Sequence, residues 1–222
     1  MRTAERTASP FVPETDDLGR LAEAVRACHG CELYRDATQA VFGTGEPAAR
    51  VMLVGEQPGD AEDRAGEPFV GPAGRVLDEV LAQAGIQRSA AYVTNVVKHF
   101  RWKSTDTGAR RLHQNPLTRH VVACSPWLIA ELRAVRPQVL VALGATAGKA
   151  LFGADFRVTE QHGVVLPWPP QHGPYAGIDV PLDSASATIH PSAVLRTRSA
   201  EDRRAAFDGM VRDLTSVAAL LG

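Results

Sequence analysis

Short apolar runs rich in β-branched residues recur along the chain, and segments with helical periodicity lie between them. The runs cover 51–54, 92–97, 139–143 and 187–189. Strands that are apolar at nearly every position are buried on both faces, which is typical of parallel sheets covered by helices. The sequence therefore predicts an α/β fold with three layers, αβα, around a central parallel sheet.

The segments between these runs carry the signals of helix ends. Pro72 stands at the first position of an expected helix over 72–84, and Gly85 follows that helix, an arrangement common in proteins. The remaining helices are expected over 17–27, from Thr118 with a break or restart at Pro126, in a short stretch that ends at Leu151, and after Ser199.

Composition limits the class of protein. The chain has 222 residues, of which 45% are hydrophobic, so it can bury the core of one domain. A net charge of -1 excludes a polybasic protein but not a local basic patch. No early apolar run follows a basic start, and no segment approaches membrane-spanning length, so we expect a cytoplasmic protein. We expect a loose N-terminal arm over 1–16 and a single domain over 17–222.

Polar side chains stand at the ends of three predicted strands. Glu56 follows the first strand, Asn95 lies near the end of the second, and His190 follows the last. Because the carboxyl ends of parallel strands share one edge, these side chains are expected to converge on one pocket. Taken alone, Glu56 fits an exposed acid in a βα turn equally well, and a lone histidine is more often structural.

The cysteines suggest a metal site. Cys28 and Cys31 form a C-x-x-C pair, and Cys124 is the only other cysteine. Three cysteines cannot complete a disulfide framework. A cluster or a zinc ion normally takes four ligands, and the best fourth candidate is His99. A Cys3His zinc site, or a redox C-x-x-C with a separate buried Cys124, remains an alternative.

The segment over 100–117 is long and has little apolar periodicity, so we expect a functional loop. From Lys98 to Arg119 there are six Lys or Arg residues and one acid, Asp106. This excess suits phosphate contacts, and Trp102 is suited to stack on a base. The alternative is a solvated basic loop.

Four motifs, in this order, resemble the iron–sulfur uracil-DNA glycosylases of family 4. They are Gly55-Glu56-Gln57-Pro58-Gly59, Pro-Phe-Val-Gly-Pro-Ala-Gly at 68–74, Thr-Asn-Val-Val-Lys at 94–98, and His190-Pro191-Ser192. Two features depart from family 4, because His99 replaces a cysteine and the chain carries Arg110-Arg111-Leu112-His113. Both resemble the UdgX subclass, whose members bind uracil-containing DNA and become covalently joined to the abasic site.

This resemblance implies catalytic roles. His190 would donate a hydrogen bond to the departing uracil. His113 would attack the sugar carbon, and Glu56 would stabilise the sugar cation and orient or deprotonate His113. The same resemblance implies a [4Fe–4S] cluster of structural role, held by Cys28, Cys31, His99 and Cys124.

The resemblance also implies how substrate is bound. Phe69 would stack on a flipped uracil, and Asn95 would hydrogen-bond its polar edge. The rest of the base pocket would come from Gly55, the backbone around Gln57, and Ser192. The DNA contacts would come from Lys98, Arg110, Arg111 and Arg196.

The expected partner is uracil-containing DNA, single strands included, with free uracil as the product. We expect a monomer with no membrane association. Two other functions stay open. One is a hydrolytic family 4-type uracil-DNA glycosylase with turnover, in which His113 only contacts phosphate. The other is a non-catalytic iron–sulfur or zinc module that binds nucleic acid.

Overall fold

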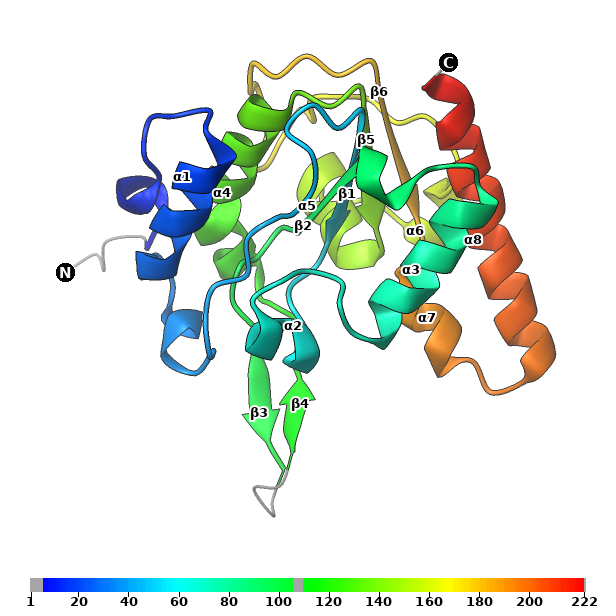
Figure 1. Ribbon diagram of the computed structural model, residues 1–222, viewed down its shortest axis with the longest axis horizontal. Helices are drawn as coiled ribbons and strands as arrows, with labels where there is room; N and C mark the ends of the chain where they lie inside the picture. Colours follow the sequence, from blue (N-terminus) through cyan, green and yellow to red (C-terminus); the bar gives the residue numbers. More distant parts are fainter. Residues whose placement is uncertain (1–5, 106–109, 222) are drawn as a thin grey trace.

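A four-stranded parallel sheet forms the middle layer of the protein, as the computed structural model shows for residues 6–105 and 110–221 (Figure 1). The strand order is β2-β1-β5-β6. The strands are β1 (Val51–Gly55), β2 (Ala91–Asn95), β5 (Val139–Leu143) and β6 (Ser184–Thr188). Every residue of β1, β2 and β5 is buried, as expected for a parallel sheet covered on both faces.

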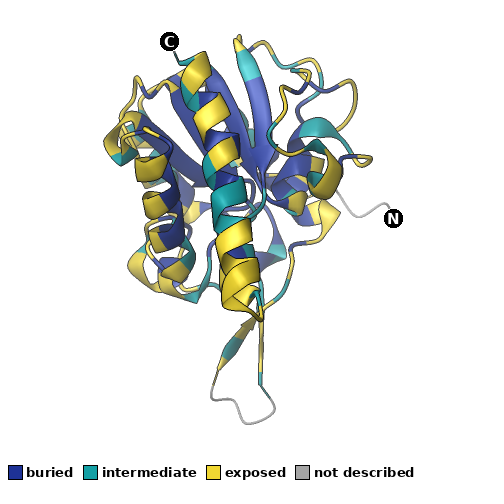
Figure 2. Ribbon diagram, turned by 90° about the vertical axis from the view of Figure 1, so that its right-hand side faces the viewer, coloured by how far each residue is buried: buried dark blue, intermediate teal, exposed yellow. Residues whose placement is uncertain are grey.

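Helices cover both faces of this sheet, so the predicted αβα fold is confirmed. Alternate residues of β1 face opposite layers. Val51 and Leu53 pack in one cluster with α3 and α8, whereas Met52 and Val54 pack in another with α4 and α5. Figure 2 shows α8 lying across the sheet with its outer side exposed. The helices are α1 (Leu18–Ala24), α2 (Asp60–Ala65), α3 (Pro72–Gln83), α4 (Thr118–Val135), α5 (Ala145–Phe152), α6 (Val158–Gln161), α7 (Pro191–Arg196) and α8 (Ala200–Leu220).

Helix α4 corrects one prediction, because it continues through Pro126 without a break. Proline has no N–H to donate to the carbonyl four residues earlier, here that of Val122. The hydroxyl of Ser125 donates to this carbonyl instead, at 2.9 Å. The neighbouring side chain therefore satisfies the acceptor that Pro126 leaves open.

The segment expected as a long loop forms a hairpin. Strands β3 (Trp102–Ser104) and β4 (Arg111–His113) pair antiparallel, with Trp102 opposite His113. The hairpin extends away from the three layers in Figure 1. Each strand has three residues, too few for an alternating pattern to stand out in the sequence.

The N-terminal segment is described from Arg6 onward. The buried residue Ala8 donates its N–H to the carbonyl of Ala123 in α4, at 2.7 Å. None of the described helices is long and apolar enough to cross a membrane. The short 3-10 helices of the described chain are Ser9–Phe11, Val25–Ala27, Glu32–Arg35 and Arg88–Ala90.

Candidate active site

A cavity of about 850 Å³ lies at the carboxyl ends of the parallel strands, where the sequence predicted a site. Glu56 reaches it from the end of β1, Asn95 from the end of β2, and His190 from the end of β6. The other predicted site residues that line it are Gln57, Phe69, His113, Ser192 and Arg196. The structure therefore brings together all three proposed catalytic side chains.

Two glycines shape the wall of this cavity around Phe69. A Cβ atom on Gly55 would collide with Oδ1 of Asn95 and lie 2.7 Å from Cζ of Phe69. Phe69 itself has a φ of 58°, which is rare outside glycine, and a Cβ on Gly74 would collide with its carbonyl oxygen. Gly55 thus makes room for Phe69 and Asn95 and does not itself line the cavity.

The tautomer of His190 follows from its contacts. The backbone N–H of Ser192 donates to Nδ1 of His190 at 3.1 Å, so this nitrogen carries a lone pair. Burial, with a smaller effect of Arg196 and His113, lowers the pKa of His190 to about 4. The neutral ring must then carry its proton on Nε2, which makes Nε2 a donor. Ser192 therefore orients His190.

His113 stands at the end of β4 and meets Glu56 across the cavity. Nε2 of His113 lies 3.5 Å from Oε1 of Glu56, and it contacts Nε2 of Gln57 at 3.0 Å. Burial lowers the pKa of His113, Glu56 acts in the opposite direction, and Arg196 adds to the lowering. A neutral imidazole, which keeps a lone pair on one of its nitrogens, is therefore favoured near neutral pH.

Oε1 of Glu56 is buried and has no hydrogen-bond partner among the described residues. Buried acceptors without a partner are rare and point to a functional demand. A carboxylate oxygen at this position favours a cation or a hydrogen-bond donor as its partner in the cavity.

Gln57 fastens the hairpin to the sheet. Its Oε1 accepts from the N–H of Arg101 at 3.1 Å, and its Nε2 lies 3.2 Å from the carbonyl of Arg101 and 3.1 Å from that of Gln114. These contacts engage both ends of the side-chain amide, so the expected contribution of Gln57 to base binding stays a prediction for its backbone.

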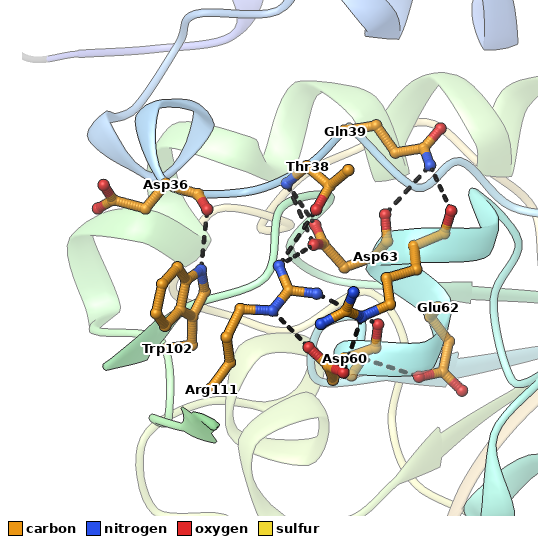
Figure 3. Close-up of polar contacts among 10 residues, drawn as sticks. Asp36, Thr38, Gln39, Asp60, Glu62, Asp63, Trp102 and Arg111 are labelled. Atoms are coloured by element: carbon orange, nitrogen blue, oxygen red, sulfur yellow. Dashed lines mark hydrogen bonds and ion pairs between the residues drawn. The ribbon is translucent and has the colours of Figure 1, made fainter. Parts of the chain in front are cut away.

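Arg111 was predicted to contact DNA, but its guanidinium lies between two aspartates of α2 (Figure 3). Nε binds Asp60, and Nη1 lies 2.6 Å from Asp63 and 3.1 Å from the hydroxyl of Thr38. Only 14% of the Arg111 side chain is exposed. These contacts make Arg111 a clamp between β4 and α2, and the prediction of a phosphate contact is corrected.

Trp102 packs against the guanidinium of Arg111. Its ring lies under the guanidinium of Arg111, 5.4 Å from centroid to Cζ, and its Nε1 donates to the carbonyl of Asp36 at 2.8 Å. It is therefore held against the body of the protein instead of standing free for a base. Asp60 and Asp63, which hold Arg111, were not predicted from the sequence. Two acids three residues apart directly after Gly59 are a signal for the first turn of a helix, where both carboxylates lie on one side.

Lys98 is a further correction. Its side chain is fully buried, and its ammonium lies 2.5 Å from Glu131, so it cannot reach a DNA phosphate. Arg110 is exposed on the hairpin and Arg196 lines the cavity, so both remain available to DNA.

The predicted cluster ligands are all buried. Cys28, Cys31 and Cys124 are free of disulfides, and burial raises the pKa of Cys124 to about 12. Burial lowers the pKa of His99 to about 4, which keeps its imidazole neutral. In the described residues, no three His, Cys, Asp or Glu side chains are grouped as holders of a single metal ion.

The sulfur atoms nevertheless receive hydrogen bonds that suit bound thiolates. Nε1 of Trp127 donates to Sγ of Cys28 at 3.2 Å, and the N–H of Lys98 donates to Sγ of Cys124 at 3.3 Å. Soft sulfur donors with one neutral imidazole fit an iron–sulfur cluster, which is wider than a single ion. The residues present therefore fit the expected group.

Comparisons with known proteins show the family to which the chain belongs. The sequence model of the Uracil DNA glycosylase superfamily matches residues 42–215, and the chain belongs to this superfamily. The Type-4 uracil-DNA glycosylase of Pyrobaculum aerophilum is 40% identical over 180 residues, which cover 81% of this chain and 85% of the relative. The Type-4 uracil-DNA glycosylase of Thermotoga maritima is 36% identical over 185 residues, which cover 83% and 86% respectively.

Proposed function

We propose that this protein is a uracil-DNA glycosylase that excises uracil and then retains the DNA through a covalent bond to His113. The names of its relatives support excision. The single observation that supports covalent capture is the position of His113, whose Nε2 lies 3.5 Å from Oε1 of Glu56 in the strand-end cavity.

The base would enter the cavity after leaving the stack or from a single strand. Phe69 offers an aromatic face at the wall, and Asn95 offers an amide donor and acceptor for the pyrimidine edge. Among the described residues, no hydrogen bond holds the Asn95 amide, so both of its polar atoms are available to uracil.

Cleavage breaks the bond between N1 of uracil and C1′ of the sugar. The electron pair leaves with uracil, and the sugar becomes an oxocarbenium-like cation. Nε2–H of His190 donates to the oxygen on which negative charge develops, while the carboxylate of Glu56 stabilises the cation. Both groups act without a change in their own protonation state.

Capture then joins Nε2 of His113 to C1′. The nitrogen supplies its lone pair, the ring becomes cationic, and the proton on Nδ1 leaves to solvent to restore a neutral ring. Glu56 stabilises the cationic stage by its charge. A bond between nitrogen and carbon at this position has no easy hydrolytic route, so one protein molecule reacts once.

A second candidate is hydrolysis with turnover, which the similarity to proteins named Type-4 uracil-DNA glycosylases favours. In that case Glu56 orients a water that attacks C1′, and His113 contacts the DNA without forming a bond.

One experiment separates the two functions. The protein is incubated with a uracil-containing oligonucleotide, single- or double-stranded, and separated on a denaturing gel beside a thymine control. A uracil-dependent band at the mass of protein plus DNA supports capture. Alkali-labile abasic sites without such a band support hydrolysis, and neither product contradicts both.

The proposed cluster would be held by Cys28, Cys31, His99 and Cys124. When bound, it would link the segment around Cys28 to α4 and to the end of β2, which is a structural role. A brown protein with broad visible absorption and bound iron supports it. A colourless protein that carries zinc would overturn it.

A further inference from the structure

Lys98 and Glu131 form an ion pair in the interior, between the end of β2 and α4. Both side chains are fully buried, and their charged atoms lie 2.5 Å apart. The ammonium also donates to Oγ1 of Thr94 at 2.6 Å and to the carbonyl oxygen of Asn95 at 2.8 Å. An ammonium has three hydrogens, and each of them has an acceptor here.

The carboxylate of Glu131 also has several hydrogen-bond donors around it. Glu131 accepts from the hydroxyl of Tyr92 at 3.1 Å, from Thr94 at 2.9 Å and from the N–H of Gly43 at 2.9 Å. A buried ion pair is often no more stabilising than apolar side chains of the same size. A gain in stability is therefore a weak explanation for two charges at this position. The hydrogen bond from the Lys98 ammonium to the carbonyl of Asn95 offers a more specific explanation.

The need for that contact follows from the position of Asn95 in the sheet. Strand β2 is an edge strand, and Val93 turns its N–H and carbonyl outward to Thr44. Asn95, two residues further on, faces the same way, and the strands of the described chain provide no partner there for its carbonyl. The ammonium of Lys98 takes the place of that partner.

The inner side of the same segment is fixed to β1. The N–H of Val96 donates to the carbonyl of Gly55 at 2.9 Å, and the N–H of Val97 donates to that of Glu56 at 3.1 Å. With Lys98 on the outer side, the backbone of Asn95 is held from both directions. The amide that faces the cavity is therefore set by a buried group that itself never reaches the cavity.

We propose that Lys98 is a positioning residue for base recognition. Its ammonium, balanced by Glu131, fixes the carbonyl of Asn95 and thereby the direction in which the Asn95 amide meets the base. This inference rests on the proposed uracil excision.

The test removes the ion pair of Lys98 and Glu131 without leaving an unpaired charge in the interior. In the double variant Lys98→Met/Glu131→Gln, the new amide still accepts from Tyr92 and Gly43. We expect a folded protein whose affinity for undamaged DNA is unchanged, because Lys98 is inaccessible to DNA. The single-turnover rate on uracil DNA should fall by about 10- to 100-fold, the effect expected of a misplaced binding group. Lys149→Met, which removes an exposed lysine of α5, serves as the control and should keep the wild-type rate.

A merely structural role is separated by combining the change with Asn95→Ala. If Lys98 acts through Asn95, the triple variant reacts no more slowly than Asn95→Ala alone. Additive losses, or a wild-type rate in the folded double variant, would overturn the proposal. A wild-type protein that leaves uracil DNA unchanged would contradict the proposed function instead.

In that case, amide hydrogen exchange over 93–97 tests whether Lys98 holds this segment. Faster exchange in the double variant would support a positioning role for Lys98, and unchanged exchange would overturn it.

Discussion

Nε2 of His113 lies 3.5 Å from Oε1 of Glu56, and this oxygen is buried without a hydrogen-bond partner among the described residues. The two side chains come from different parts of the fold, His113 from the hairpin and Glu56 from the end of β1. Their distance therefore depends on how the hairpin is attached to the sheet. Gln57 and Arg111 supply that attachment.

Replacing His113 by alanine should abolish the covalent adduct, because no lone pair remains at that position to bond with C1′. Uracil recognition should persist, because Phe69, Asn95 and His190 are untouched. Denaturing gels score the adduct, and release of free uracil scores excision. His162→Ala is the matched control, since His162 pairs with Asp213 outside the cavity. An adduct formed by His113→Ala would remove His113 as the nucleophile.

Replacing Glu56 by glutamine should slow adduct formation by about 100-fold or more, because the amide keeps the shape of the side chain but loses its charge. Rapid-quench single-turnover kinetics measures the effect. Glu67→Gln, which neutralises an exposed acid, should react at the wild-type rate. Equal rates for Glu56→Gln and the wild type would exclude the proposed role.

The pH dependence should report a neutral nucleophile. Burial lowers the pKa of His113 below its usual 6.5, so the ring is deprotonated at neutral pH. The adduct rate should be constant above about pH 6.5 and should fall at more acidic pH, where protonation removes the lone pair. His190, with a pKa of about 4, stays neutral across most of this range. A rate that rises between pH 7 and pH 5 would indicate that a histidine must be charged.

Arg111→Met should loosen the hairpin and reduce the adduct rate by about 10-fold or more, because a nucleophile displaced by 1 Å reacts much more slowly. Faster amide hydrogen exchange in β4 should accompany this loss. Arg110→Met is the matched control, because Arg110 directly precedes β4 and is exposed. It should weaken DNA binding and reduce the salt dependence of binding, with unchanged exchange in β4. Matching effects of the two variants on exchange would argue against the clamp.

The sequence allowed the layers and the pocket to be predicted because both follow from local patterns. Continuous apolar runs indicate a parallel sheet, and polar residues at the ends of those runs converge by topology. The failures concern partners distant in the sequence. Lys98 was predicted to contact DNA as part of a basic run, but it pairs with Glu131 of α4 in the interior. Arg111 was misassigned in the same way, since a count of charges does not reveal Asp60 and Asp63 beside it.

Helix α4 shows that contacts between neighbouring residues can be as hard to predict from the sequence as contacts between distant ones. A proline usually ends a helix, but α4 continues through Pro126. The hydroxyl of Ser125 donates to the carbonyl of Val122, which Pro126 leaves without its usual donor. Side-chain direction of this kind cannot be read from residue type alone.

The attachment of His113 to a two-stranded hairpin has a consequence for how the two proposed steps are divided in the fold. Glu56 and His190 stand at strand ends of the four-stranded sheet, whereas His113 is carried by a hairpin whose described strands pair only with each other. In the proposed mechanism, bond cleavage and covalent retention therefore depend on separate parts of the fold. On that mechanism, the sheet residues by themselves would release uracil and turn over, and the hairpin, attached through one glutamine and one arginine, would convert repeated turnover into a single event.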